Sequence, residues 1–132
     1  MLETAKKILV VDDEPFALAI VERLLKQEGY TVHLAKNGSD ALKICLKYKP
    51  DLVLLDLMMP GISGEEVCRE IRTSCAEVKI VYFSAKQFFY SKVNFSDSCS
   101  QPDGFIAKPA SSKLILSTVR NVLSGKNQKA GK

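Results

Sequence analysis

The chain has little of what several classes of protein depend on. It has 132 residues, no tryptophan and a single histidine, His33, so a histidine-based metal site or a Ser/His/Asp triad has little support. Its four cysteines form no CxxC pair, and we expect them to be reduced thiols. No apolar run approaches the ~20 residues that a membrane span needs, and the N-terminus lacks the apolar core of a signal peptide. We therefore expect one cytoplasmic domain with no membrane contact.

The chain also carries little excess charge outside its C-terminal end. The formal net charge is +4, but three lysines lie in the last seven residues, and 16 basic against 15 acidic side chains remain without them. We predict a domain over 1–125 followed by a disordered basic tail or linker stub over 126–132. Because most of the basic excess belongs to that tail, we do not expect this domain to bind nucleic acid.

Short apolar runs alternate regularly with amphipathic stretches along the chain. The runs suit strands buried on both faces, and the stretches repeat apolar residues at helical spacing between turn signals. This alternation predicts an α/β fold, a single doubly wound five-stranded parallel sheet with helices on both faces. The predicted strands cover 7–11, 30–35, 52–55, 79–83 and 104–107. The predicted helices lie between Pro15 and Gly29, Ser39 and Pro50, and Glu65 and Thr73, and a last helix is capped by Ser111 or Ser112 and ends at Gly125.

One segment, 87–103, departs from this pattern. It is rich in aromatic residues and serines and poor in strong helix formers. We expect helix four there to be short or irregular, with some of Phe88, Phe89, Tyr90 and Phe95 exposed as an interaction site. The alternative, in which these rings pack inward on the sheet, fits the sequence equally well.

The chain is organised around the strand over 52–55, which ends abruptly in an acid. A buried strand has no structural need for an acid at its end. Four of the five predicted strands end in a polar or charged group, and the carboxyl ends of parallel strands meet at one edge of the sheet. The residues expected to converge at that edge are Asp12, Asp13, Asp56, Ser84 and Lys108.

This combination of groups indicates phosphoryl transfer. Three carboxylates at one edge repel each other, and Mg²⁺, which prefers oxygen ligands, would neutralise them. Lys108 adds a second positive charge, Ser84 offers a hydroxyl donor, and Asp56 is placed to act as the nucleophile. Catalysis would then consist mainly of positioning and electrostatic stabilisation.

Four motifs carry these residues: Val-Val-Asp-Asp-Glu-Pro15, Leu-Leu-Asp-Leu-Met-Met-Pro-Gly-Ile-Ser-Gly64, Phe-Ser-Ala85 and Ala-Lys-Pro109. They resemble the signatures of response-regulator receiver domains of two-component signal transduction, and the resemblance covers residues 7–124. It implies a flavodoxin-like fold with the strand order 2-1-3-4-5. It also implies a phosphorylation-activated switch that accepts a phosphoryl group on Asp56 from a histidine kinase or a histidine phosphotransfer protein. The switch would then change the face that binds an output partner or output domain.

The resemblance also implies the metal ligands. Asp13, Asp56 and the backbone carbonyl of Met58 would bind Mg²⁺ directly, and Asp12 would act mainly through water. It implies no enzymatic activity beyond Mg²⁺-dependent self-phosphorylation and self-dephosphorylation at Asp56.

By the same resemblance, Ser84 and Lys108 would contact the phosphoryl group. Ser84 would move toward that group, and the aromatic ring of Phe105 would follow inward as the second half of the switch. Because Phe105 has no phenolic hydroxyl, packing alone could govern its movement; an ordinary core aromatic is the other reading of this residue. The peptide bond before Pro109 is expected to be cis.

Two positions are expected to set the lifetime of the phosphorylated state. By resemblance, Met58 and Lys86 flank the path of the attacking water. Neither side chain is a good general base at neutral pH, since methionine has no basic site and lysine is protonated. We therefore expect slow self-dephosphorylation.

Two other classes start from related patterns. A phosphatase of the haloacid dehalogenase type would need a second aspartate two residues after the nucleophile, where this chain has Met58, or Glu14 after Asp12. A flavodoxin-like electron carrier would need a phosphate-binding loop where this chain has acids that repel phosphate. The sequence identifies neither the cognate kinase, the output partner nor the oligomeric state, and it does not show whether the domain is part of a longer protein.

Overall fold

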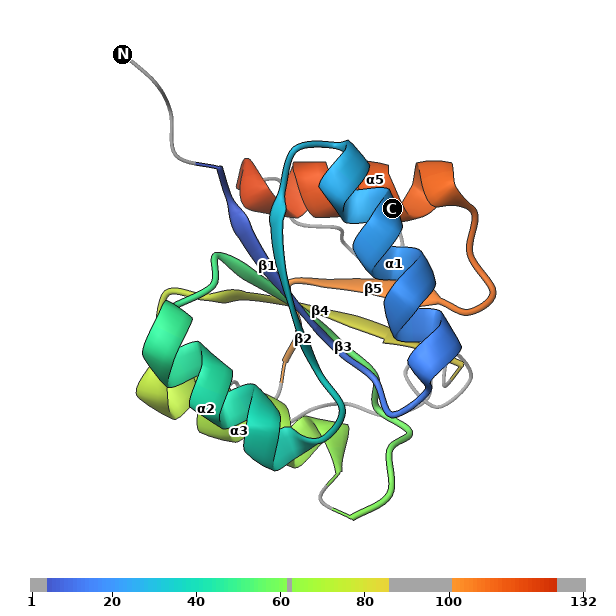
Figure 1. The fold of residues 1–132 in the computed structure, drawn as a ribbon. Coiled ribbons are helices and arrows are strands. Elements are labelled where there is room, and N and C mark those ends of the chain that lie inside the picture. Colours follow the sequence, from blue (N-terminus) through green and yellow to red (C-terminus); the bar gives the residue numbers. More distant parts are fainter. Residues whose placement is uncertain (1–4, 62, 86–100, 126–132) are drawn as a thin grey trace.

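The structure is a computed structural model that describes residues 5–61, 63–85 and 101–125. Five parallel strands form one sheet in the order β2-β1-β3-β4-β5, which confirms the predicted fold class and strand order (Figure 1). The strands are β1 (Lys7–Val11), β2 (Thr31–Ala35), β3 (Leu52–Leu55), β4 (Lys79–Ser84) and β5 (Gly104–Ala107), and the helices are α1 (Pro15–Gln27), α2 (Gly38–Tyr48), α3 (Gly64–Ser74) and α5 (Ser112–Leu123). Most of the segment 87–103 lies outside the described residues, so its short helix and the exposure of its rings stay predictions.

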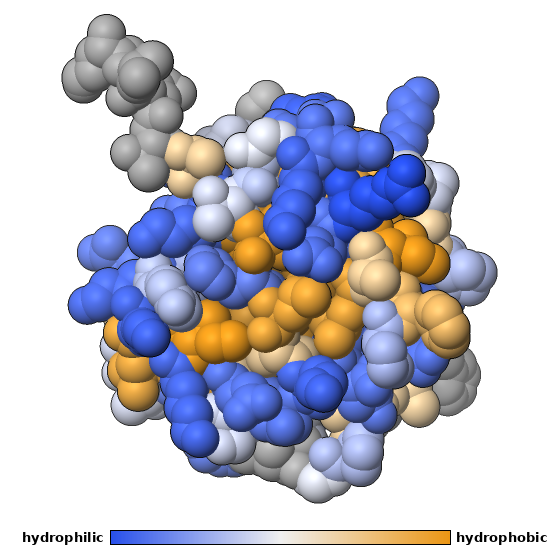
Figure 2. Space-filling view, in the orientation of Figure 1, coloured by the Kyte–Doolittle hydropathy of each residue, from blue (hydrophilic) through white to orange (hydrophobic). Residues whose placement is uncertain are grey.

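The helices cover the sheet on both sides and build a separate core on each. Helices α1 and α5 lie on one face, and α2 and α3 lie on the other (Figure 1). Successive side chains of β3 enter alternate cores: Val53 and Leu55 face α2 and α3, whereas Leu52 and Leu54 face α1 and α5. Two buried faces explain the continuous apolar run, because no position of this strand meets water. None of the described helices has the length and hydropathy needed to cross a bilayer, and hydrophilic residues cover much of the face shown in Figure 2.

The helix ends follow local capping rules, with one correction to the sequence analysis. The second helix begins at Gly38 and not after Ser39, because the side chain of Asn37 accepts a hydrogen bond of 2.8 Å from the backbone N–H of Asp40. This bond satisfies one of the free N–H groups of the first turn, which is the role of an N-cap. The last helix is capped in the same way by Ser111, which accepts from Leu114 at 3.1 Å.

Candidate functional site

Backbone hydrogen bonds align the carboxyl ends of neighbouring strands. The N–H of Asp56, one residue past β3, donates to the carbonyl of Val11 at the end of β1 at 3.1 Å. The N–H of Lys108, one residue past β5, donates to the carbonyl of Ser84 at the end of β4 at 3.0 Å. The ladder thus continues one residue beyond the strands, and it fixes where the first side chain of each loop starts.

Three carboxylates come together at this edge. Asp12, Asp13 and Asp56 each offer an oxygen, and the three oxygens lie within 4.8 Å of one another. Asp12 and Asp56 are buried, at 3% and 7% exposed, and Asp13 is exposed. Negative charges this close and this shielded from water raise the free energy of the folded state unless cations or N–H donors offset them.

The loops supply two of those donors from their own backbone. The N–H of Glu14 donates to Asp12 Oδ1 at 2.9 Å, and the N–H of Met58 donates to Asp56 Oδ1 at 3.0 Å. In both cases the donor lies two residues after the acid, so each carboxylate stabilises the turn of the loop that follows it. The second oxygen of each carboxylate, Oδ2, faces Lys108.

Lys108 is the cation that reaches two of the three acids. Its Nζ lies 2.5 Å from Asp12 Oδ2 and 3.5 Å from Asp56 Oδ2, and 5.0 Å above the centre of the Phe83 ring. The ring contact adds a favourable cation–π interaction beneath the ammonium. The single positive charge of Lys108 does not balance three carboxylates, and the net negative charge that remains favours the binding of a divalent cation. Clustered carboxylate oxygens are the donor set that Mg²⁺ prefers, and the residues therefore fit this ion.

The two residues predicted to form the switch lie on neighbouring strands. Ser84 ends β4, is fully buried and pairs with Ala107 of β5. Phe105 pairs with Tyr82, is partly buried and packs against the core beneath α2 and α3. The peptide bond between Lys108 and Pro109 is cis.

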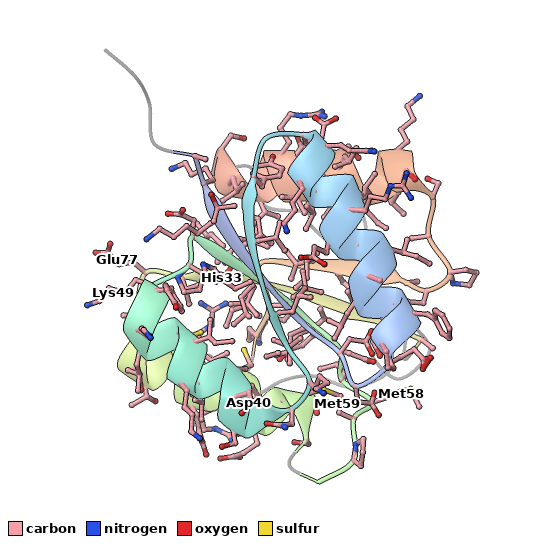
Figure 3. The ribbon with its side chains drawn as sticks, in the orientation of Figure 1. His33, Asp40, Lys49, Met58, Met59 and Glu77 are labelled. Atoms are coloured by element: carbon pink, nitrogen blue, oxygen red, sulfur yellow. The ribbon has the colours of Figure 1, made fainter. Side chains whose placement is uncertain are left out.

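The loop after β3 presents one apolar side chain to solvent beside the cluster. Met58 is 56% exposed, whereas Leu57 and Met59 on either side are buried (Figure 3). The predicted lifetime position in this loop is therefore open to water and to a variant side chain. Its predicted counterpart, Lys86, lies outside the part of the chain that the structure describes.

Gly64, which the sequence analysis named only as the last residue of a motif, is a close-packed part of the site. It is the first residue of α3, and a Cβ there would lie 2.6 Å from Leu57 Cα and 3.0 Å from the carbonyl oxygen of Asp56. Only glycine allows the helix to approach the backbone of the predicted phosphoacceptor this closely. A glycine directly after the helix cap Ser63 was the available signal.

A second anchor, also not foreseen, holds the start of β5. Asp103 Oδ2 accepts from Arg72 Nη2 of α3 at 2.9 Å and from the N–H of Ile80 in β4 at 2.8 Å. Burial alone would lower the pKa of Arg72, but the hydrogen bond and the charge of Asp103 raise it above its usual value. These contacts of Asp103 with Arg72 and Ile80, the Arg72–Asp103 clamp, fix the start of β5, and Lys108 follows five residues after Asp103.

Comparison with known families agrees with this geometry. A family model described as the response regulator receiver domain matches residues 8–120 of the chain. Response regulator protein TrrA from Thermotoga maritima, solved in a complex with Mg²⁺-BeF, is 37% identical with a TM-score of 0.79, and the match covers 89% of this chain and 98% of that one.

Two further solved structures have the same architecture. A LuxR-family two-component response regulator from Aurantimonas sp. SI85-9A1 is 25% identical with a TM-score of 0.83, over 97% of this chain and 91% of that one. A CheY-like receiver domain protein from Methanospirillum hungatei JF-1 is 22% identical with a TM-score of 0.81, over 93% and 97% of the two chains, and at that identity it supports the fold alone.

Proposed function

The chain belongs to the family of response regulator receiver domains, and we propose that it is a phosphorylation-activated switch whose phosphoacceptor is Asp56. Receiver domains are in general signalling switches rather than enzymes. The observation that carries the choice of Asp56 is its position: it lies at the end of a central strand, within reach of two further carboxylates and of Lys108 Nζ. The N–H of Met58 donates to one of its oxygens and Lys108 lies at the other, so the two groups orient the carboxylate.

The proposed step transfers a phosphoryl group from a phosphohistidine. A carboxylate oxygen of Asp56 attacks the phosphorus, an O–P bond forms, the P–N bond breaks, and the imidazole nitrogen leaves with the bonding electron pair. Lys108 is already placed at Asp56 Oδ2, so its ammonium can offset the charge that arrives with the phosphoryl oxygens. Positioning and electrostatics do the rest of the work in this kind of reaction.

The same proposal assigns the metal site. Asp12, Asp13, Asp56 and the backbone carbonyl of Met58 would hold Mg²⁺, with Asp12 acting mainly through water. When bound, Mg²⁺ supplies positive charge to the phosphoryl oxygens. Asp12 stays bound to Lys108 at 2.5 Å, so one of the three carboxylates is partly neutralised by the chain itself.

Phosphorylation is proposed to be read out through Ser84 and Phe105. Ser84 ends the strand next to β5, and Phe105 lies on β5 itself, so a movement of one backbone is felt by its hydrogen-bonded neighbour. The ring of Phe105 is partly buried, and the proposed switch changes how deeply it packs. This change would alter the face that an output partner or output domain binds.

The partners themselves stay proposals. The donor would be a histidine kinase or a histidine phosphotransfer protein, and the cytoplasmic location predicted from the sequence is where such a donor would act. Residues 1–125 would form the switch, with 126–132 as a basic tail or linker stub. Nucleic acid is not proposed as a ligand of this domain.

Phosphorylation with a small donor tests the proposal against its rivals. Acetyl phosphate with Mg²⁺ should add one phosphoryl group, labile as an acyl phosphate is, and a partner or dimer that forms only then would reveal the output. Steady turnover of a generic phosphomonoester would instead support a phosphatase of the haloacid dehalogenase type. A flavin absorbance spectrum would support an electron carrier, although the acids at 12–14 argue against phosphate binding there.

A further inference from the structure

Two cysteines meet at the opposite edge of the sheet from the carboxylates. Cys45 lies near the C-terminal end of α2, and Cys75 ends α3 as its C-cap. The Sγ of Cys75 lies 3.6 Å from the carbonyl oxygen of Cys45. Burial, and after it the charge of Cys75, raises the pKa of the Cys45 thiol to about 12.

The two thiols differ in access to solvent. Cys45 is fully buried, whereas Cys75 is partly exposed. A hollow of about 370 Å³ opens onto Cys75 at the ends of the two helices. Figure 3 shows Lys49 and Glu77, which line this hollow, at the C-terminal end of α2, away from Met58 and the carboxylate edge. A small reagent can therefore reach Cys75, whereas the buried Cys45 does not line the hollow.

We propose that Cys75 is a thiol–disulfide exchange site for low-molecular-weight disulfides such as oxidised glutathione, and that Cys45 completes the reaction as an internal disulfide. In the first step the Cys75 thiolate attacks one sulfur of the reagent. A new S–S bond forms, the reagent's S–S bond breaks, and one glutathione thiolate leaves. In the second step the Cys45 thiolate attacks the Cys75 sulfur and displaces the second glutathione. The protons of the two protein thiols end on the two released glutathiones, so one disulfide is reduced as one is formed.

Proximity, and not an unusual nucleophile, drives the second step. The 3.6 Å contact between the sulfur of Cys75 and the carbonyl oxygen of Cys45 places the two residues next to each other, and the internal disulfide requires their Cβ atoms to approach to about 3.5–4.5 Å. Burial of Cys45 keeps it from reacting alone with the reagent, so the order of the two steps is fixed. The third described cysteine, Cys68, is equally buried but lies beside Tyr82 and Arg72.

The internal disulfide would join α2 to α3. It links residues 30 apart in sequence and so restricts the unfolded chain, which raises the thermal midpoint. Because the bond forms at the amino end of the strands, phosphorylation at the carboxyl end should proceed in both redox states.

Intact mass of the folded protein after exposure to oxidised glutathione tests the site. The parent is a Cys99→Ser variant, since Cys99 lies beyond the described residues. We expect the parent to lose the mass of two hydrogen atoms, with the bond mapped to Cys45 and Cys75. Cys75→Ser should show neither the loss nor an adduct, and Cys45→Ala should stop at a glutathione adduct on Cys75. The matched control, Cys68→Ala, should react as the parent does.

Several results would overturn the site. The parent could carry only a stable glutathione adduct, its disulfide could include Cys68, or Cys75→Ser could react as the parent does. If Cys45→Ala does not fold, the disulfide mapped in the parent is by itself the test of the proposal. Any partner of Cys75 other than Cys45 then contradicts it. The thermal midpoint should rise on oxidation of the parent and return with a reducing agent.

Discussion

Lys108 Nζ lies 2.5 Å from Asp12 Oδ2, although the two residues are 96 apart in sequence. The contact joins the end of β5 to the end of β1. Between them, β3 delivers Asp56 at 3.5 Å from the same ammonium. The two distances from the ammonium of Lys108 therefore depend on the relative positions of β1, β3 and β5. Any change that moves one of these strand ends should appear in both the stability and the reactivity of the cluster.

Loss of the lysine charge should destabilise the domain. Lys108→Met leaves Asp12 and Asp56 buried without their cation, and breaking a fully buried pair costs roughly 3–5 kcal/mol. Because Lys108 keeps 24% of its side chain exposed, we expect a smaller loss of unfolding free energy, about 1–3 kcal/mol. Denaturant unfolding measures it. The exposed Lys113→Met is the matched control, and equal losses in the two variants would contradict the role of Lys108.

Magnesium should stabilise the folded chain through Asp13. An ion that binds only the native cluster raises the thermal midpoint with its concentration and relieves the repulsion among the carboxylates. We expect the midpoint to rise with millimolar Mg²⁺ and Asp13→Ala to remove most of the rise. Asp40→Ala, which removes a partly exposed acid outside the cluster, should keep it. A full Mg²⁺ response in Asp13→Ala would show that Asp13 is not a ligand.

Gly64 should be needed for the geometry of the site as well as for stability. The methyl group of Gly64→Ala meets Leu57 Cα and the Asp56 carbonyl, and such overpacking costs about 1–3 kcal/mol. The comparison is Gly125→Ala, which is strained at φ +88° but meets open space and should cost about 1–2 kcal/mol. Only the Gly64 variant should also slow phosphorylation by acetyl phosphate. Equal phosphorylation rates in the two variants would show that the geometry of the site does not depend on Gly64.

The lifetime of the phosphorylated state should be long and should shorten on substitution at two positions. Met58→Asn and Lys86→Glu introduce groups that can hydrogen-bond an attacking water, and the exposure of Met58 leaves room for one. Decay of the phosphorylated protein after removal of the donor gives the rate. Lifetimes equal to or longer than that of the parent in both variants would show that these positions do not control hydrolysis.

The sequence predicts the elements of this fold better than the contacts between them. The apolar runs of β1 and β3 are local signals, and both strands lie where the pattern places them. The gathering of Asp12, Asp13, Asp56 and Lys108 follows from parallel strands, which the alternation of strands and helices predicts. The strand order, in contrast, came from resemblance, since no local signal in β2 says which strand it pairs with.

Contacts that depend on tertiary packing could not be predicted from the sequence. Asn37 rather than Ser39 caps α2, because the choice between neighbouring cap residues depends on where the chain leaves β2. The close approach of Gly64 to Asp56 and the clamp between Arg72 and Asp103 each join segments that meet only once α3 packs on the sheet. Such distances are set by the assembled backbone and not by any one stretch of chain.

The most direct measurement is the intact mass of the protein after incubation with Mg²⁺ and acetyl phosphate, for the parent beside Asp56→Asn and Asp40→Asn. The account predicts that the parent and Asp40→Asn each gain one phosphoryl group, which is lost on mild alkaline hydrolysis. It predicts that Asp56→Asn gains none, because an amide is not a comparable nucleophile. An unchanged mass gain in folded Asp56→Asn would contradict the assignment of Asp56 as the phosphoacceptor.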